Sequence, residues 1–91
     1  MCDNDYIPEL IVATRIYEVS VVKNSDVWYA RLVYLFDGMF SKSELSKIID
    51  KLFDMGVIKG KWLHINNGKW VYSLYITNDY LSFIKEVYEH A

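Results

Sequence analysis

The sequence predicts an α+β fold that is mostly helical, in the order helix, helix, helix, strand, strand, helix. The first observation behind this prediction is a sharply bounded helical pattern at 42–55 that leads directly into two strand-like runs, 57–65 and 69–77. The second is the change in apolar spacing, from a helical period of about 3.6 residues to the strand period of about 2. The third is a further helical pattern at 79–89.

Residues 8–22 are expected to form the first helix. Pro8 has the fixed φ that suits the first helical position, and Glu9 suits the first turn because the N-terminus of a helix attracts negative charge. Residues 16–22 are rich in β-branched side chains and partly alternating, so a strand near the end of this segment is an alternative. The polar residues 23–25 then end the segment.

The second helix is expected at about 27–37. Ser25 or Asp26 can cap it, because both side chains accept hydrogen bonds from the first turn of a helix. Gly38 can end it, since glycine readily adopts the left-handed conformation that follows a helix. The segment is apolar nearly all round, with Arg31 as its one interior charge. A helix of this composition is expected to lie at the centre of the fold.

The third helix, 42–55, has the clearest boundaries. Ser41 is the expected N-cap, and Glu44 follows at the spacing of a capping box, in which each residue bonds the backbone N–H of the other. Gly56 suits the left-handed position after the helix. Apolar residues at three- and four-residue spacing predict one buried face. They are Leu45, Ile48, Ile49, Leu52 and Phe53.

The runs 57–65 and 69–77 contain the β-branched and aromatic residues that strands favour. Between them Asn67-Gly68 has the chemistry of a two-residue type I′ turn, in which both residues need positive φ. Thr77-Asn78-Asp79 can cap the last helix, expected at about 79–89. That helix has an apolar stripe for packing. The stripe consists of Tyr80, Leu81, Ile84, Val87 and Tyr88.

A helix that leads directly into a hairpin is the arrangement of recognition helix and wing in a winged helix-turn-helix, which usually binds duplex DNA. Residues 41–58 resemble the recognition-helix region of MarR-, PadR- and ArsR-type regulators. In those families a leucine, two or three residues, a glycine and an aliphatic pair precede the wing, as do Leu52, Gly56 and Val57-Ile58 here. Ile76-Thr77 also matches the aliphatic-threonine pair that closes the wing in the MarR and PadR groups. In size the chain is similar to small winged-helix proteins of archaea and their viruses.

This resemblance implies a homodimer with one recognition helix per subunit in the major groove. It further implies wings against the flanking DNA backbone and terminal helices packed across the dimer axis. Residues 30–36 are bulkier and more aromatic than the short polar helix that precedes the recognition helix in many relatives. The subfamily is therefore left open.

Charge is distributed unevenly along the chain. The formal net charge is −2 and the pI is about 5.6, whereas nucleic-acid-binding domains are often strongly basic. Residues 42–69, however, carry six lysines against three acidic residues, a balance of +3, while residues 1–41 and 70–91 are both acidic. Positive charge favours contact with phosphates, because each neutralised phosphate releases a counterion. We therefore expect this central segment to face DNA.

The candidate DNA-binding residues follow from the helical geometry. With the apolar face inward, the roughly 100° step per residue turns Lys47 and its neighbours outward. Lysine can donate to guanine, and Asp50 can accept from a cytosine amino group. Ordinary helix-surface ion pairs at three-residue spacing are the alternative interpretation. The candidates are Lys42, Ser43, Ser46, Lys47, Asp50, Lys51, Lys59, Lys61, Asn66, Asn67 and Lys69.

The hairpin also has a high aromatic content, in Trp62, Trp70, Tyr72 and Tyr75. We interpret these residues as packing residues, because a two-stranded hairpin needs helices against it to be stable. The alternative is an aromatic platform on which the bases of single-stranded nucleic acid stack.

No catalytic, cofactor or metal site is expected. His64 and His90 have no companion cysteines or clustered carboxylates at metal-ligand spacing. Cys2 has no nearby histidine or basic residue to lower its pKa, so it is not an evident nucleophile. The glycines stand singly rather than in a phosphate-binding loop. We therefore do not expect an enzyme.

The whole chain, 1–91, is expected to form a single winged-helix domain. It has no long apolar run and no signal-peptide pattern, and its single cysteine agrees with a reducing compartment, so we expect a cytoplasmic protein without a membrane segment. With 53% hydrophobic and 16% aromatic residues, it has more apolar surface than a domain this small needs. We therefore expect homodimerisation through the first and last helices.

The expected function is sequence-specific binding of double-stranded DNA by a homodimeric transcriptional regulator. The alternative is a winged-helix module that binds another protein, for which the acidic total charge would be the relevant signal. An effector ligand is left open.

Overall fold

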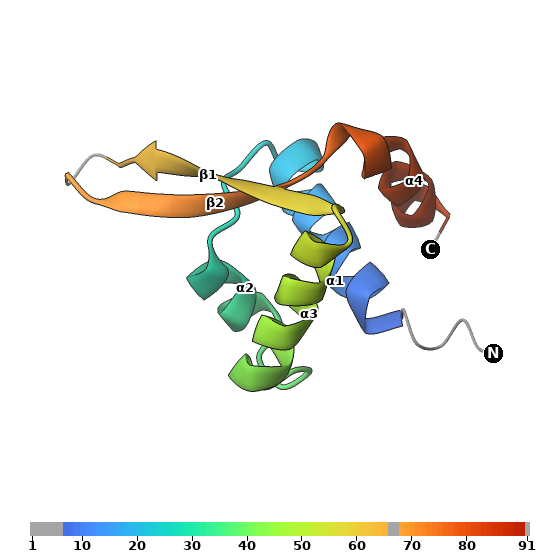
Figure 1. The fold of residues 1–91 in the computed structure, drawn as a ribbon, viewed down its shortest axis with the longest axis horizontal. Helices are drawn as coiled ribbons and strands as arrows, with labels where there is room; N and C mark the ends of the chain where they lie inside the picture. Colours follow the sequence, from blue (N-terminus) through green and yellow to red (C-terminus); the bar gives the residue numbers. More distant parts are fainter. Residues whose placement is uncertain (1–6, 66–67, 91) are drawn as a thin grey trace.

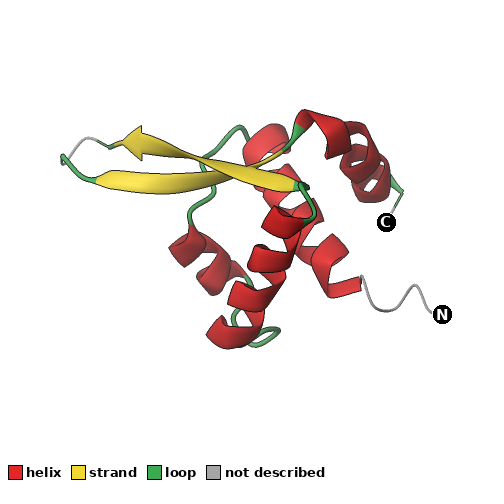
Figure 2. Ribbon diagram, viewed as in Figure 1, coloured by secondary structure: helices red, strands yellow, loops and turns green. Residues whose placement is uncertain are grey.

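The computed structural model describes residues 7–65 and 68–90. The predicted order of helices and strands, and the mostly helical α+β class, are confirmed (Figures 1 and 2). No helix in the described ranges is long and apolar enough to cross a membrane. The elements are α1 (Ile7–Tyr17), η2 (Glu18–Val22), α2 (Tyr29–Leu35), α3 (Lys42–Asp54), β1 (Ile58–His64), β2 (Trp70–Ile76) and α4 (Asn78–Glu89).

The first helical segment reaches residue 22 as expected, but its last turn, η2, is a π-helix. The Lys23 N–H donates to the Glu18 carbonyl at 2.9 Å, which is the i to i+5 spacing of a π turn. The Ser20 hydroxyl donates to the Ile16 carbonyl at 2.7 Å, a second hydrogen bond in this part of the segment. Val19 is buried on its inner side. The alternative of a strand at 16–22 is therefore wrong.

Residues 27 and 28 are extended rather than helical, so the expected start of the second helix at 27 is wrong. The Leu74 N–H donates to the Val27 carbonyl at 2.8 Å, and the Val27 N–H donates to the Ser73 hydroxyl at 3.1 Å. Trp28 forms a β-bridge with Ser73. Pairing with β2 therefore delays the start of α2 until Tyr29.

α2 also lies at the edge of the fold, so its expected central position is wrong. Leu32 is the buried residue of this helix, while Tyr34 is 79% exposed. Arg31 is exposed and donates to the Ser25 hydroxyl at 2.9 Å and to the Asp26 carbonyl at 3.3 Å. The two predicted cap residues therefore bind an arginine instead of capping the helix.

The predicted beginning and end of α3 are confirmed. The Glu44 N–H donates to the Ser41 hydroxyl at 3.1 Å, and the Ser41 N–H donates to the Glu44 carboxylate at 2.8 Å, which completes the capping box. Gly56 has a φ of +75°, and the next N–H, that of Val57, donates to the Leu52 carbonyl at 3.0 Å. The predicted inner face of α3 is buried in the core.

β1 and β2 form an antiparallel hairpin whose register runs from Ile58 opposite Ile76 to His64 opposite Trp70. Beyond the strands, the Ile65 N–H donates to the Lys69 carbonyl at 2.9 Å. The connection therefore spans residues 66–68 and is longer than the predicted two-residue turn. Gly68 has the expected positive φ, +82°, whereas Asn66 and Asn67 lie outside the described residues.

The hydrophobic core lies where α1, α3, α4 and the base of the hairpin meet. α4 packs on α1, where the rings of Tyr17 and Tyr88 lie 5.4 Å apart and Ile84 is buried. The far part of the hairpin extends beyond the helices as an arm (Figure 1). Only the base of the hairpin is therefore covered by helices.

Candidate nucleic-acid interface

The outward side of α3 is the central part of the candidate interface. Its inner side chains are buried, so the polar residues between them point to solvent. The structure brings together the predicted residues of this helix on that exposed side. They are Lys42, Ser43, Ser46, Lys47 and Asp50.

Lys51, also predicted for this surface, lies on the side of α3 nearest α1. Its ammonium nitrogen is 3.8 Å from the Oε2 atom of Glu9, a residue that is only 8% exposed. The other carboxylate oxygen of Glu9 is buried and has no hydrogen-bond partner among the described residues. The positive charge of Lys51 therefore compensates a buried carboxylate, a structural role separate from contact with phosphate.

Tyr29 adds a residue that the sequence analysis did not select. It is the first residue of α2, and its hydroxyl donates to the Lys42 carbonyl at 3.3 Å, at the first turn of α3. The side chain is still 42% exposed, so it borders the polar side of α3. Because the second helix was expected to begin at residue 27, Tyr29 was not predicted to be its first residue. No motif in the sequence marks its contact with α3.

Lys59 and Lys61 of the hairpin do not lie on the same side as α3. Lys59 and Lys61 alternate along β1 with residues of the face that packs toward α3, so they point to the opposite face. Lys59 lines a small hollow together with Thr77 and Asp79. Lys69 follows the loop, and Asn66 and Asn67 lie outside the described residues. The predicted site is therefore divided between α3 and the far face of the wing.

The face of the hairpin toward α3 carries rings instead. Trp62 lies opposite Tyr72, and His64 lies opposite Trp70, so these four residues share one face, which we call the aromatic face. Trp62 is 64% exposed and Trp70 is 62% exposed. The prediction that these tryptophans are packing residues is therefore wrong. The cause lies in the tertiary structure: the outer part of the hairpin extends past the helices, so no helix covers the tryptophans (Figure 1).

Successive rings of the aromatic face contact one another from α3 outward. The ring of Phe53 on α3 is 6.5 Å from that of Tyr72, and the ring of Tyr72 is 5.0 Å from that of Trp62. Farther out, the rings of His64 and Trp70 are 4.9 Å apart. An exposed aromatic surface therefore begins beside α3 and continues along the hairpin.

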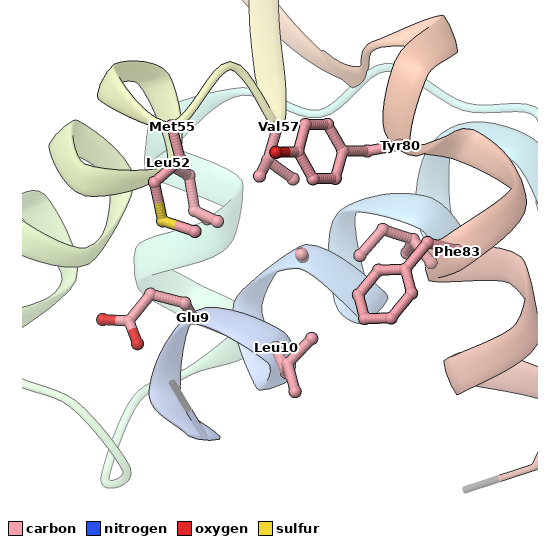
Figure 3. Close-up of a pocket in the computed structure, with 9 residues that line it drawn as sticks. Glu9, Leu10, Leu52, Met55, Val57, Tyr80 and Phe83 are labelled. Carbon is pink, nitrogen blue, oxygen red and sulfur yellow. The ribbon is translucent and has the colours of Figure 1, made fainter. Parts of the chain in front are cut away.

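A separate apolar groove lies between α1, the end of α3 and α4. It has a volume of about 360 Å³. Figure 3 shows Tyr80 and Phe83 of α4 on one side of it, with Leu52 and Met55 of α3 across from them. Phe83 lines the groove and is 53% exposed, so the groove continues onto an exposed apolar surface.

Neither histidine has the surroundings of a metal ligand. His64 stacks with Trp70, and His90 lies 3.3 Å from the carboxylate of Glu86. Over residues 7–65 and 68–90, no three histidine, cysteine or acidic side chains are grouped so that they could hold a metal ion.

No protein-family model and no curated protein matches the chain. A solved structure does match, described as the crystal structure of a PadR family transcription regulator from hypervirulent Clostridium difficile R20291. The two chains are 16% identical and superpose with a TM-score of 0.57, over 93% of this chain and 88% of the other. Together with the helix order and the hairpin, this likeness shows that the protein has a winged-helix fold similar to that of a PadR family transcription regulator.

Proposed function

We propose that this protein binds double-stranded DNA through α3 and acts as a transcriptional regulator. The observation that carries the proposal is the exposed polar side of α3, centred on Lys47, in a winged-helix fold shared with a transcription regulator. An α-helix fits the major groove of B-DNA, which is about 12 Å wide. The capping box at Ser41 and Glu44 holds the first turn of α3, where a recognition helix contacts bases.

The side chains of α3 have distinct roles in this proposal. Lys47 donates to the acceptors of guanine, and Ser43 and Ser46 make adaptable hydrogen bonds to base edges. Asp50 accepts from the amino group of cytosine, a position in which its charge does not face phosphate. Lys42, at the start of the helix, contacts the DNA backbone.

The wing supplies further positive charge. Residues 57–77 contain Lys59, Lys61 and Lys69 and no acidic residue. We propose that Lys69, with Asn66 and Asn67, contacts the DNA backbone beside the major groove, while Lys59 and Lys61, which point to the opposite face of the hairpin, add long-range attraction for the DNA. Such contacts position a protein on DNA without reading its sequence. Specificity would therefore come from α3.

We further propose that the active form is a homodimer in which α1 and α4 meet across a two-fold axis. Phe83 is 53% exposed, and Ile7 and Ile11 of α1 are 45% and 36% exposed. All three side chains belong to the two helices beside the apolar groove. A two-fold interface places the same patch of both subunits together, so Phe83 of each copy can enter the groove of the other.

Fluorescence anisotropy with a labelled mixed-sequence duplex, titrated over a salt series, tests DNA binding. The logarithm of affinity should fall linearly with the logarithm of salt concentration. Lys47→Glu should weaken binding by roughly tenfold or more. Lys23→Glu is the matched control, because it makes the same charge change at the exposed end of η2, away from α3 and α4, and it should have little effect. Lys51 is unsuitable for this test because its reversal would place a second carboxylate beside Glu9.

Absence of binding at low salt, or equal losses in both variants, would contradict the proposal. The first outcome would favour the alternative, a winged-helix module that binds another protein, which the net charge of −2 supports. Charge reversal at Lys47 would then leave binding to that partner intact unless the partner contacts the same side of α3.

Sedimentation equilibrium tests the dimer. Phe83→Glu should yield a monomer, because a carboxylate cannot enter an apolar groove without losing its hydration. Val22→Glu is the matched control, since Val22 is 54% exposed on η2, away from the groove. A monomeric wild-type protein at all concentrations would refute this part of the proposal.

A further inference from the structure

We propose that the aromatic face of the wing is a second nucleic-acid site, which binds unpaired bases by stacking. The face consists of Tyr72, Trp62, Trp70 and His64, as defined above. Duplex binding by α3 makes no use of these rings, and the core does not cover the two tryptophans. The proposal therefore assigns a function to the largest exposed apolar side chains of the hairpin.

The inner rings are held in place by the fold. Tyr72 lies over Gly60, where even a Cβ atom would collide with the tyrosine ring. Tyr72 also contacts the rings of Phe53 on α3 and of Trp62, and the Trp62 ring is tilted by 58° relative to the tyrosine. Trp62 is therefore supported from one side and remains 64% exposed. A ring ordered in this way loses little conformational freedom when a base stacks on it.

The outer rings provide a second position. His64 and Trp70 lie 4.9 Å apart with an angle of 32° between their planes, which is closer to parallel than the inner pair. Trp70 is 62% exposed despite this contact. In the register of the hairpin, Trp62 and Trp70 are diagonal neighbours on adjacent strands. The Cα atoms of such neighbours are roughly 7–8 Å apart. Two neighbouring unpaired bases can therefore each stack on one tryptophan ring.

The charge of the hairpin favours a nucleic acid over an apolar protein surface. Residues 57–77 carry three lysines and no acidic residue. Lys59 and Lys61 lie on the opposite face of this single-layer hairpin, so they attract phosphates to the hairpin as a whole. Rings for bases and nearby cations for phosphates are the combination that binds single strands without a fixed sequence.

The occupant is expected to be unpaired, because bases in a duplex already stack on their neighbours and present only their edges in the grooves. The shared chemistry is a flat heterocycle joined to a phosphate backbone, so single-stranded DNA and RNA both qualify. Oligothymidine and oligouridine of equal length distinguish the two sources.

Fluorescence anisotropy with these two labelled oligonucleotides at low salt is the direct test. The wild-type protein should bind at least one of them, and replacing both Trp62 and Trp70 with alanine should weaken binding by roughly five- to a hundredfold for each stacked base. Tyr34→Ala is the matched control, because Tyr34 is an exposed ring on α2, and it should change affinity by less than about twofold.

Two further double variants separate stacking from apolar contact. Replacing both tryptophans with phenylalanine keeps aromatic rings and should retain much of the affinity. Replacing both with leucine keeps apolar area without a ring and should behave like the alanine variant. Equal affinities of the phenylalanine and leucine variants would overturn the proposal.

Tryptophan fluorescence gives an independent measurement. A base stacked on Trp62 or Trp70 should quench its emission, whereas half-buried Trp28 should respond little. The phenylalanine double variant should therefore bind the oligonucleotide without quenching. Quenching that persists in this variant would place the bound strand elsewhere and contradict the assignment.

The test is independent of the proposed duplex site. Lys47→Glu should weaken duplex binding and retain oligonucleotide binding, while the alanine double variant should show the reverse. Failure of both oligonucleotides to bind at low salt would overturn the proposal. It would also be overturned if sedimentation showed that the alanine double variant converts a dimer to a monomer, since the rings would then join two copies of the chain.

Discussion

The hydroxyl of Thr77 donates a 2.6 Å hydrogen bond to the carbonyl of Gly56. The Thr77 N–H donates to the Val57 carbonyl at 2.9 Å. These bonds join the end of β2 to the turn that leaves α3, and they hold the two ends of the hairpin together. Thr77 occupies the N-cap position of α4, but its side chain makes no capping bond there. Its hydroxyl thus holds the hairpin to the end of α3.

Thr77→Val should therefore lower the free energy of unfolding by about 1 kcal/mol, since the shape is kept and one hydrogen bond is lost. Thr77→Ser retains the hydroxyl and should lose less. Urea unfolding followed by circular dichroism measures both. A valine variant as stable as the wild type would show that water replaces the hydroxyl at no cost.

Gly56→Ala should lower the free energy of unfolding by about 1–2 kcal/mol. The cause is backbone conformation, because φ is +75° and a Cβ atom at Gly56 would meet nothing within 4 Å. Gly56→Asn should cost less, since asparagine tolerates the left-handed region better. Thermal unfolding should rank the wild type first, then asparagine, then alanine. Equal values for the two variants would contradict this explanation.

The capping box should make stability depend on acidity. The hydrogen bonds from Ser41, first that of its backbone N–H, lower the pKa of Glu44 below its ordinary value of 4.5. When the pKa is lower in the folded state, the carboxylate stabilises the fold fully at pH values above its pKa in the unfolded chain. This stabilisation is lost as the pH falls through the pKa in the folded state. The melting temperature should therefore decrease below about pH 4.5.

Glu44→Gln isolates this contribution, because glutamine can still accept the Ser41 bond but does not titrate. The variant should show a smaller loss of melting temperature between neutral pH and pH 3 than the wild type. Glu89→Gln, at the exposed last residue of α4, is the control and should leave the pH dependence unchanged. Parallel pH profiles for Glu44→Gln and the wild type would disprove the role of Glu44.

Ile16→Val should lower the free energy of unfolding by about 0.5–1.5 kcal/mol, because Ile16 is fully buried and the lost methylene leaves a small cavity. Val22→Ala removes two methyl groups from a side chain that is 54% exposed, and it should change stability by less than about 0.5 kcal/mol. Chemical denaturation measures both variants. Equal losses of unfolding free energy in the two variants would mean that burial does not determine the destabilisation at these positions.

Sequence reasoning succeeded where the structure depends on neighbouring residues. The capping box needs only Ser41 and Glu44, three positions apart, and the left-handed end of α3 needs only Gly56. The buried face of α3 follows from spacing, and so does the exposure of Lys47 on the other side. These features of the candidate site could therefore be located before the fold was known.

Reasoning from spacing failed where a distant segment decides the outcome. Val27 bonds to Ser73, 46 residues away, and this pairing replaces the first turn expected for the second helix. Nothing in residues 25–37 indicates it, because the partner strand is not local. The charge of Lys51 is likewise engaged by Glu9 of another helix, which helical spacing within α3 cannot predict.

The sequence by itself determined the order of elements and the limits of α3, because these depend on hydrogen bonds and side-chain periods within a few residues. The concentration of positive charge in residues 42–69 can be read directly from the sequence. Only the tertiary structure decided which aromatic residues are covered. Trp62 and Trp70 are residue types that are often buried, yet they remain exposed because the outer part of the hairpin extends beyond the helices (Figure 1). Burial depends on what lies opposite a side chain, and that is a property of the assembled fold.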